Sequence, residues 1–190
     1  KLPEYIYLTH NHLDHTGELP ILLLDFSKRK KSPVQILGNQ KVINIVRKYR
    51  MHELYDTGIN IDKIATWVVA DEEGVIQLSD GLMLKLVESQ HSYTCYGFLL
   101  FKDGVPILGY SGDSGYNADI YTFVSQADQV VLDGRAKSSY EHASFSEIDK
   151  HAARHPQKQF YVTHHEIGDF EFKSGNVEFL EIGKVIELQA

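Results

Sequence analysis

One short stretch of the chain, Thr9-His10-Asn11-His12-Leu13-Asp14-His15, holds three imidazoles and one carboxylate within six residues. It follows an apolar strand predicted over residues 5–8 and precedes a helix predicted over residues 18–31, where apolar side chains form a helical stripe. His10 and His12 alternate along the chain and so can point to one side. Asp14 and His15 lie where the chain turns toward the helix. They can reach a second point nearby.

Imidazole and carboxylate groups are the donors that Zn, Mn and Fe take in proteins. Four of them exceed what one ion with an open catalytic position normally binds, so the stretch predicts two metal ions. The alternative is structural, since a lone His or Asp in a loop is usually solvated or hydrogen-bonds the start of a helix. Four such residues packed together at the end of a strand favour metal ligands.

Composition places the chain among globular proteins. Its 190 residues predict one domain over residues 1–190, with 43% hydrophobic and 24% charged residues. No apolar run approaches the roughly 20 residues of a membrane span, so no membrane partner is expected. The single cysteine, Cys95, excludes an internal disulfide and favours a reducing compartment, the cytoplasm. The formal charge of -7 argues against a broad surface for long nucleic acids and favours a small-molecule or short nucleotide substrate.

The order of predicted elements indicates an α/β protein. A second strand over 34–38 and a helix over 39–49, capped by Asn39, complete a βαβα pattern. Five short β-type runs separated by glycine turns then predict an antiparallel meander, at residues 66–70, 75–78, 82–88, 96–101 and 105–110. The rest alternates again, with helices at 118–125 and 144–154 and strands at 129–132 and 160–163. Ser144 and Glu147 predict a capping box for the last helix. Together these elements predict a layered α/β sandwich.

The motif His10-x-His12-x-Asp14-His15, followed by Thr16-Gly17, resembles the signature of the metallo-β-lactamase superfamily. The resemblance implies a four-layered αββα sandwich with two metal ions. The later matches follow in the family's order: His91 between strands, Asp113 in Ser111-Gly112-Asp113-Ser114, and His164 after Tyr161-Val162-Thr163. By the resemblance, His10, His12 and His91 hold one metal, Asp14, His15 and His164 hold the second, and Asp113 bridges both. Taken singly, each of the later residues also fits an ordinary structural role.

Two divalent ions, expected to be Zn with Mn or Fe as alternatives, would share a bridging hydroxide that attacks an ester phosphorus or carbonyl. The resemblance gives Asp14 a second role, that of orienting this hydroxide. The neighbouring His165 leaves the last ligand open between two imidazoles. The resemblance favours His164, because in the family the ligand directly follows the strand. Classical β-lactamases use a Cys at the second metal, whereas Cys95 is expected to be a buried structural thiol, so antibiotic hydrolysis is not expected.

The segment His142-Ala143-Ser144 and the strand that follows it are similar to the ribonuclease Z-like phosphodiesterases. The likeness implies that His142 assists the departing oxygen of a phosphodiester, with support from Asp133. Alternatively, His142 only occupies a helix start, where an imidazolium is unfavourable. Arg135 and Lys137 are either phosphate-binding residues or ordinary surface charge.

The substrate favoured by these features is a small or compact phosphodiester, such as a cyclic nucleotide, a dinucleotide or an oligonucleotide end. The alternatives are hydrolysis of a carboxylic ester, lactone or thioester at the same metals, and metal binding without turnover. Members of the superfamily begin with several strands before the first motif, and these are missing here. The domain is therefore expected to be incomplete at its N-terminus and completed by a missing segment or a partner. A homodimer is a further expectation, since phosphodiesterase relatives commonly dimerise.

Overall fold

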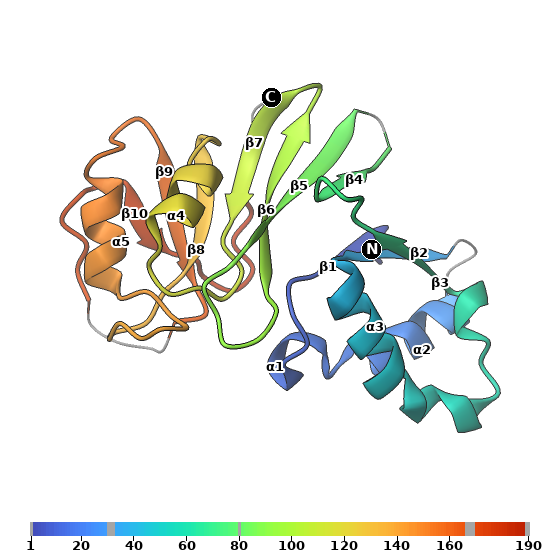
Figure 1. Ribbon diagram of the computed structural model, residues 1–190. Helices are drawn as coiled ribbons and strands as arrows, with labels where there is room; N and C mark the ends of the chain where they lie inside the picture. The colour runs from blue at the N-terminus through green and yellow to red at the C-terminus, as the bar shows by residue number, and fades with distance from the viewer. Residues whose placement is uncertain (1, 30–32, 80, 166–169, 189–190) are drawn as a thin grey trace. The chain divides into compact units, whose positions relative to one another are not determined.

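The computed structural model describes residues 2–29, 33–79, 81–165 and 170–188. The chain divides into two compact units, Lys1–Ile76 (unit 1) and Gln77–Ala190 (unit 2), and each is described by itself. Each combines a β-sheet with helices (Figure 1), which confirms the predicted α/β class. Each also has its own hydrophobic core. The prediction of a single domain over residues 1–190 stays a prediction. Within the described part of the chain, no helix has the length and apolar character needed to cross a membrane.

Unit 1 is built on a three-stranded parallel sheet. Its strands, in spatial order, are β1 (Tyr5–Leu8), β2 (Val34–Gly38) and β3 (Ala65–Val69). The connections run through α1 (Leu13–Thr16), α2 (Leu19–Arg29), α3 (Gln40–Tyr49) and the 3-10 helices η1 (Met51–Thr57) and η2 (Ile61–Lys63). The connections from β1 to β2 and from β2 to β3 each move to the next strand in the same direction across the sheet. With the same handedness for both, α2 and α3 lie on the same face (Figure 1).

The core of unit 1 explains why the helical stripe predicted from the sequence forms a helix. Leu23 and Phe26 of α2 are buried and pack in one cluster with Ile36 of β2 and Val46 of α3. Asn39 caps α3 as predicted, since its side chain accepts a hydrogen bond from the backbone N–H of Lys41 at 2.9 Å. The end of the first predicted helix, at residues 30–31, lies outside the described residues.

The prediction that residues 66–70 belong to an antiparallel meander is wrong. Residues 66–69 belong to β3, which pairs parallel with β2 in a register that places Trp67 beside Ile36. A parallel neighbour needs a crossover connection, and α3 with the two 3-10 helices supplies one. A short β-type run carries no local signal for the direction of its partner, so the pairing depends on the helix before it.

Unit 2 is built on a larger mixed sheet. Its strands are β5 (Leu82–Glu88), β6 (Tyr96–Lys102), β7 (Val105–Tyr110), β8 (Gln129–Asp133), β9 (Gln159–Thr163) and β10 (Val177–Phe179). The sheet order is β10-β9-β8-β7-β6-β5-β4, and the division between the units falls within β4 (Val75–Gln77). The predicted antiparallel pairing of β5 with β6 and of β6 with β7 is confirmed. From β7 to β10 all pairs are parallel.

Two helices connect the parallel strands of unit 2, α4 (Ala118–Val124) after β7 and α5 (Phe145–Ala152) after β8. The predicted capping box is present, because Ser144 and Glu147 bond reciprocally at the start of α5. Ile148 of α5 packs with Leu132 and Phe160 in the core. Since β7, β8 and β9 are parallel, their carboxyl ends share one edge of the sheet, the usual place for ligand sites in such sheets.

Candidate metal centre

The predicted metal ligands of unit 1 follow the carboxyl end of β1. His10 is fully buried, and its Nδ1 lies 2.9 Å from the hydroxyl of Thr9. The ring of His10 has its centroid 4.6 Å from that of His12 and 4.2 Å from that of His15. The three imidazoles of the motif therefore form one cluster.

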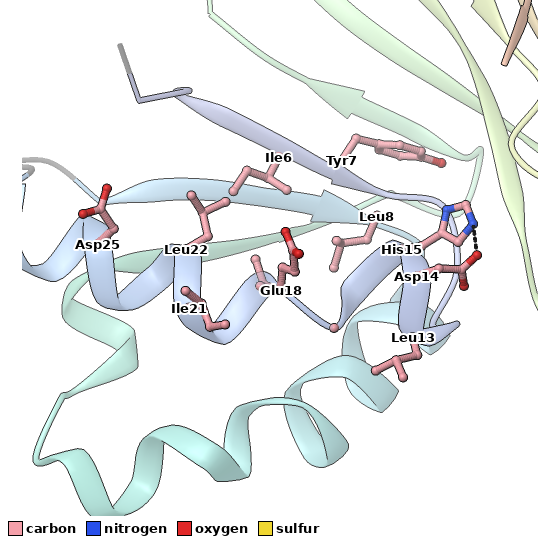
Figure 2. A pocket seen from close by; sticks show the side chains of 12 residues that line it. Ile6, Tyr7, Leu8, Leu13, Asp14, His15, Glu18, Ile21, Leu22 and Asp25 are labelled. Atoms are coloured by element: carbon pink, nitrogen blue, oxygen red, sulfur yellow. Dashed lines mark ion pairs between the residues drawn. The ribbon is translucent and has the colours of Figure 1, made fainter. Parts of the chain in front are cut away.

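Asp14 and His15 lie on α1, a single turn that the sequence analysis treated as a loop. Oδ2 of Asp14 is 3.5 Å from Nε2 of His15, the ion pair drawn in Figure 2. The Asp14 side chain is 65% exposed, whereas that of His15 is 18% exposed. Because the Asp14 carboxylate is exposed beside a clustered imidazole, it can bind a metal ion or a water molecule without rearrangement of the core.

Arg50 braces the segment of residues 11–16, a role that was not predicted from the sequence. Its guanidinium donates to the carbonyl oxygen of Asn11 at 3.0 Å and to the hydroxyl of Thr16 at 3.2 Å. That hydroxyl in turn donates to the carbonyl oxygen of His12 at 2.9 Å. Arg50 is the C-cap residue of α3, so the end of that helix fixes the backbone that carries the histidines. No local pattern in the sequence connects an arginine at a helix end with a loop so distant along the chain.

A groove of about 1070 Å³ runs along β1 and α2 of unit 1. Figure 2 shows Asp14 and His15 at one end of it and Asp25 at the other. Apolar side chains line most of the length between them, among them Ile6, Leu8, Leu19, Ile21 and Leu22. The candidate metal ligands of unit 1 thus border an apolar surface depression.

Unit 2 brings together four acidic and imidazole side chains at the shared edge of its parallel strands. Asp113 follows β7, Asp133 ends β8, His142 precedes α5 and His164 follows β9. One ligand atom from each of these residues lies within 4.8 Å of those of the others. Three of these residues were predicted as metal ligands or as the leaving-group acid, and Asp133 was predicted only to support His142.

Asp133 is the centre of the group. It is 1% exposed and both carboxylate oxygens have partners: Oδ2 lies 2.8 Å from Nδ1 of His142, and Oδ1 lies 3.1 Å from Nδ1 of His164. Oδ2 also accepts the backbone N–H of Ser114 at 3.0 Å. A buried carboxylate without hydrogen-bond partners is costly, and these bonds both satisfy its oxygens and orient two imidazoles at once.

His164 has an unusual backbone conformation, with φ of 58° in the left-handed region. Residues other than glycine rarely adopt it, and they do so mostly where the surrounding structure enforces it at functional sites. Nδ1 of His164 is 3.5 Å from Oδ2 of Asp113. The hydrogen bond with Asp133 raises the pKa of His164 above its ordinary value, although burial opposes this. The ring of the adjacent His165 instead packs against that of Phe179 in a tilted arrangement, with centroids 4.5 Å apart.

Asp113 is buried in a turn that requires glycine before it. Gly112 has φ of 62°, and a Cβ there would lie 3.1 Å from the sulfur of Cys95. Cys95 is itself fully buried, and burial together with the nearby charge of Asp113 raises its pKa to about 12. Its sulfur is therefore a neutral thiol at physiological pH. Among the described residues, the side chains close enough together to share an ion in this group are Asp113, Asp133, His142 and His164 and do not include Cys95, so its donors are nitrogen and oxygen.

His91 lies in the segment between β5 and β6 and is 8% exposed. The backbone N–H of Tyr93 donates to Nδ1 of His91 at 3.1 Å. The ring of His91 is 6.1 Å from that of His142, centroid to centroid. His91 thus borders the group of four in unit 2.

Arg135 brings positive charge to this group, since its Nη2 lies 3.1 Å from Nε2 of His164. Lys137, the other basic residue considered from the sequence, is exposed. The donors in both units are imidazoles and carboxylates, which fit Zn, Mn or Fe. The chemistry of the donor sets therefore suits divalent metal binding in each unit.

Comparison with known proteins is consistent with this donor chemistry. Residues 3–186 match the sequence profile of a family described as anti-Pycsar protein Apyc1. No curated protein sequence matches the chain. Among solved structures, the metallo-β-lactamase fold protein YhfI from Bacillus subtilis is similar with a TM-score of 0.77 and 17% identity, over 97% of this chain and 78% of that one.

Two further solved structures share the fold. The short form of human tRNase Z has a TM-score of 0.74 and 18% identity, over 98% of this chain and 80% of its own. A diphosphatase from the PhnP family has a TM-score of 0.70 and 17% identity, over 97% of this chain and 72% of its own. These matches confirm the metallo-β-lactamase fold inferred from the resemblance of the motifs.

Proposed function

The chain belongs to the anti-Pycsar protein Apyc1 family, and on that premise we propose that it is a metal-dependent hydrolase of a small phosphodiester. The substrate class is a cyclic nucleotide, a dinucleotide or an oligonucleotide end. The names of two fold neighbours, a tRNase Z and a diphosphatase, support phosphoryl chemistry on this fold. The net charge of -7 favours a compact substrate over a long nucleic acid.

The proposed ligands are those of the motif comparison. His10, His12 and His91 would hold one divalent ion, Asp14, His15 and His164 would hold a second, and Asp113 would serve both. When bound, such ions lower the pKa of water and stabilise the negative charge that develops on phosphoryl oxygens. The clustering of the imidazoles within unit 1, and of Asp113 with His164 within unit 2, supports the assignment.

The observation that carries the choice of a phosphodiester is the pair of Asp133 and His142. The bond of 2.8 Å to the buried carboxylate fixes the Nδ1 side of the imidazole and leaves Nε2 to face a substrate. An alkoxide leaving group needs a proton as its bond to phosphorus breaks, and an imidazole held by a carboxylate can deliver it. Activated esters and thioesters have better leaving groups and need this proton less.

Two more residues receive roles in this proposal. Asp14, which is exposed beside His15, orients the attacking water. Arg135 neutralises the negative charge on a non-bridging oxygen of the phosphodiester. Its guanidinium already lies beside the ring of His164.

The test is the dependence of His142→Ala on the leaving group. We expect the variant to lose about 100- to 10,000-fold in kcat on a dinucleotide, which releases an alkoxide, because the general acid is absent. The loss on bis(p-nitrophenyl) phosphate should be much smaller, because p-nitrophenolate leaves without a proton. His52→Ala is the control, since His52 is exposed on η1 of unit 1.

Equal losses on both phosphodiesters would contradict the role of His142. If the metal-loaded wild type left both phosphodiesters intact and cleaved a lactone or thioester, the substrate class would be wrong while the fold and the metal ligands stood.

A further inference from the structure

We propose that Tyr93 and Tyr140 form a stacking subsite for the base of a nucleotide, at the rim of the metal-ligand group of unit 2. The inference rests on the proposed function and deepens it, because it makes the nucleobase a recognised part of the substrate. Both rings belong to the segments that carry the candidate ligand His91 and the candidate acid His142.

Tyr93 is coupled to His91 through its backbone and remains accessible through its ring. Its N–H donates to Nδ1 of His91, and the two ring centroids are 6.2 Å apart. The residue is 55% exposed. The base of a nucleotide is separated from its phosphate by one sugar, so a phosphate near His91 would bring its base within reach of this ring.

Tyr140 occupies the corresponding place in the segment before His142. It is 65% exposed, and its carbonyl oxygen accepts a hydrogen bond from the amide of Gln90 at 3.2 Å. Ser139 fixes the two residues that follow Tyr140, since its hydroxyl accepts the backbone N–H groups of Glu141 at 3.2 Å and of His142 at 3.0 Å. The ring of Tyr140 therefore projects from a backbone that is held in place.

Further contacts fasten the two tyrosine segments to each other. The hydroxyl of Ser92 donates to the carboxylate of Glu141. The side-chain oxygen of Gln90 accepts from Asn117 at 3.3 Å, which holds the amide group that donates to Tyr140. Gly115 lies where the segments meet, because a Cβ there would be 2.2 Å from the carbonyl oxygen of Tyr140 and 2.6 Å from the amide nitrogen of Gln90. The segment that carries Tyr93 is thus bonded to the segment that carries Tyr140.

Exposed aromatic rings on a braced backbone, beside the candidate metal ligands, are a suitable surface for a nucleobase. Every base has an aromatic face, so stacking binds bases without reading their edges, and placing a fixed ring costs little conformational entropy. The alternative is that both are ordinary surface tyrosines. Unit 1 offers matched controls for that alternative, since Tyr49 is 53% and Tyr55 is 65% exposed.

The experiment measures binding of a nucleoside 5′-monophosphate and of ribose 5-phosphate to the metal-loaded protein by calorimetry. We expect Tyr93→Ala and Tyr140→Ala each to weaken nucleotide binding about 10-fold, as loss of one stacked ring does elsewhere. Binding of ribose 5-phosphate, which has no base, should stay unchanged. Tyr93→Phe and Tyr140→Phe should keep wild-type affinity, because stacking needs the ring and not the hydroxyl. Tyr49→Ala and Tyr55→Ala should have no effect.

Equal loss of both ligands in the alanine variants would overturn the subsite, because the tyrosines would then only support the loops. Wild-type protein that binds the nucleotide no more tightly than ribose 5-phosphate would overturn it as well. Turnover of a phosphodiester by the wild type is measured separately. If turnover is present and the preference for the nucleotide is absent, the subsite fails and the proposed function stands, whereas absent turnover contradicts the proposed function itself.

Discussion

The candidate ligands of unit 1 are neighbours in sequence, whereas those of unit 2 are neighbours only in the folded sheet. The first group occupies one continuous segment after β1, residues 10–15, which runs into α1 and in which the rings of His10, His12 and His15 cluster. The second group comes from four separate segments that the parallel strands bring to one edge. A local cluster depends on the conformation of its own loop, and a dispersed cluster depends on strand order. The two groups should therefore respond differently to change in their surroundings.

Removal of one ligand from each group is expected to have the largest effect. His12→Ala in unit 1 and His164→Ala in unit 2 should each lower the bound metal and bring phosphodiester turnover to background, because the proposed chemistry uses both groups. Elemental analysis and turnover assays measure this, with His52→Ala as control. Full turnover in either variant would show that one group acts without the other.

Loss of the brace on the loop of unit 1 should follow in size. Arg50→Ala removes the bonds to Asn11 and Thr16, so we expect metal affinity to fall about 10- to 100-fold, as for residues that orient ligands. Competition with a chromogenic chelator measures the affinity. Arg47→Ala is the control, since Arg47 binds Asp62 away from the loop. Equal metal affinities in Arg50→Ala and Arg47→Ala would mean that the histidine cluster of unit 1 does not depend on the hydrogen bonds of Arg50.

A change of charge in the group of unit 2 should have a smaller effect. Arg135→Gln should lower kcat/KM for a phosphodiester about 10-fold, as loss of one charged hydrogen bond does. Lys137→Gln, at an exposed position two residues on, should leave it unchanged. The initial rates of the two variants at low substrate concentration decide the point. Equal losses in both would assign the effect to general surface charge.

The smallest effects are expected from the helix caps, one in each unit. Asn39→Ala at α3 and Ser144→Ala at α5 should each cost about 1 kcal/mol of unfolding free energy at neutral pH. Burial would raise the pKa of Glu147, but its bonds with Ser144 outweigh this and lower it. The contribution of Glu147 is thus present at neutral pH and is lost as the pH falls through its folded pKa. In urea titrations, the loss of unfolding free energy caused by Ser144→Ala should become smaller below pH 4.5. The loss caused by Asn39→Ala should stay constant.

The sequence predicts the parts of this molecule that depend on local pattern. The helix after Asn39 and the capping box at Ser144 follow from spacing and polarity within one or two turns. Asp14 and His15 were grouped with the histidines because all of them stand in one stretch of chain. The partner of β3 could not be predicted in this way, because it is set by the crossover through α3.

Arg50, which was not predicted from the sequence, and Asp133, which was predicted only to support His142, both connect distant segments. Arg50 braces the loop of unit 1 from the end of a helix, and Asp133 joins His142 to His164 across the edge of a sheet. A single Asp at the end of a strand, or a single Arg at the end of a helix, has many ordinary explanations in sequence. Only the order of parallel strands and the packing of α3 give these two their partners.

Metal-dependent turnover of bis(p-nitrophenyl) phosphate, by the wild type beside Asp113→Ala, tests most directly that the protein hydrolyses phosphodiesters through its His/Asp groups. Asp119→Ala, an exposed aspartate on α4, is the matched control. The account predicts turnover that a chelator abolishes and that Zn or Mn restores, no turnover in Asp113→Ala, and wild-type rates in Asp119→Ala. Turnover that survives the chelator, or an Asp113→Ala variant as active as the wild type, would contradict it.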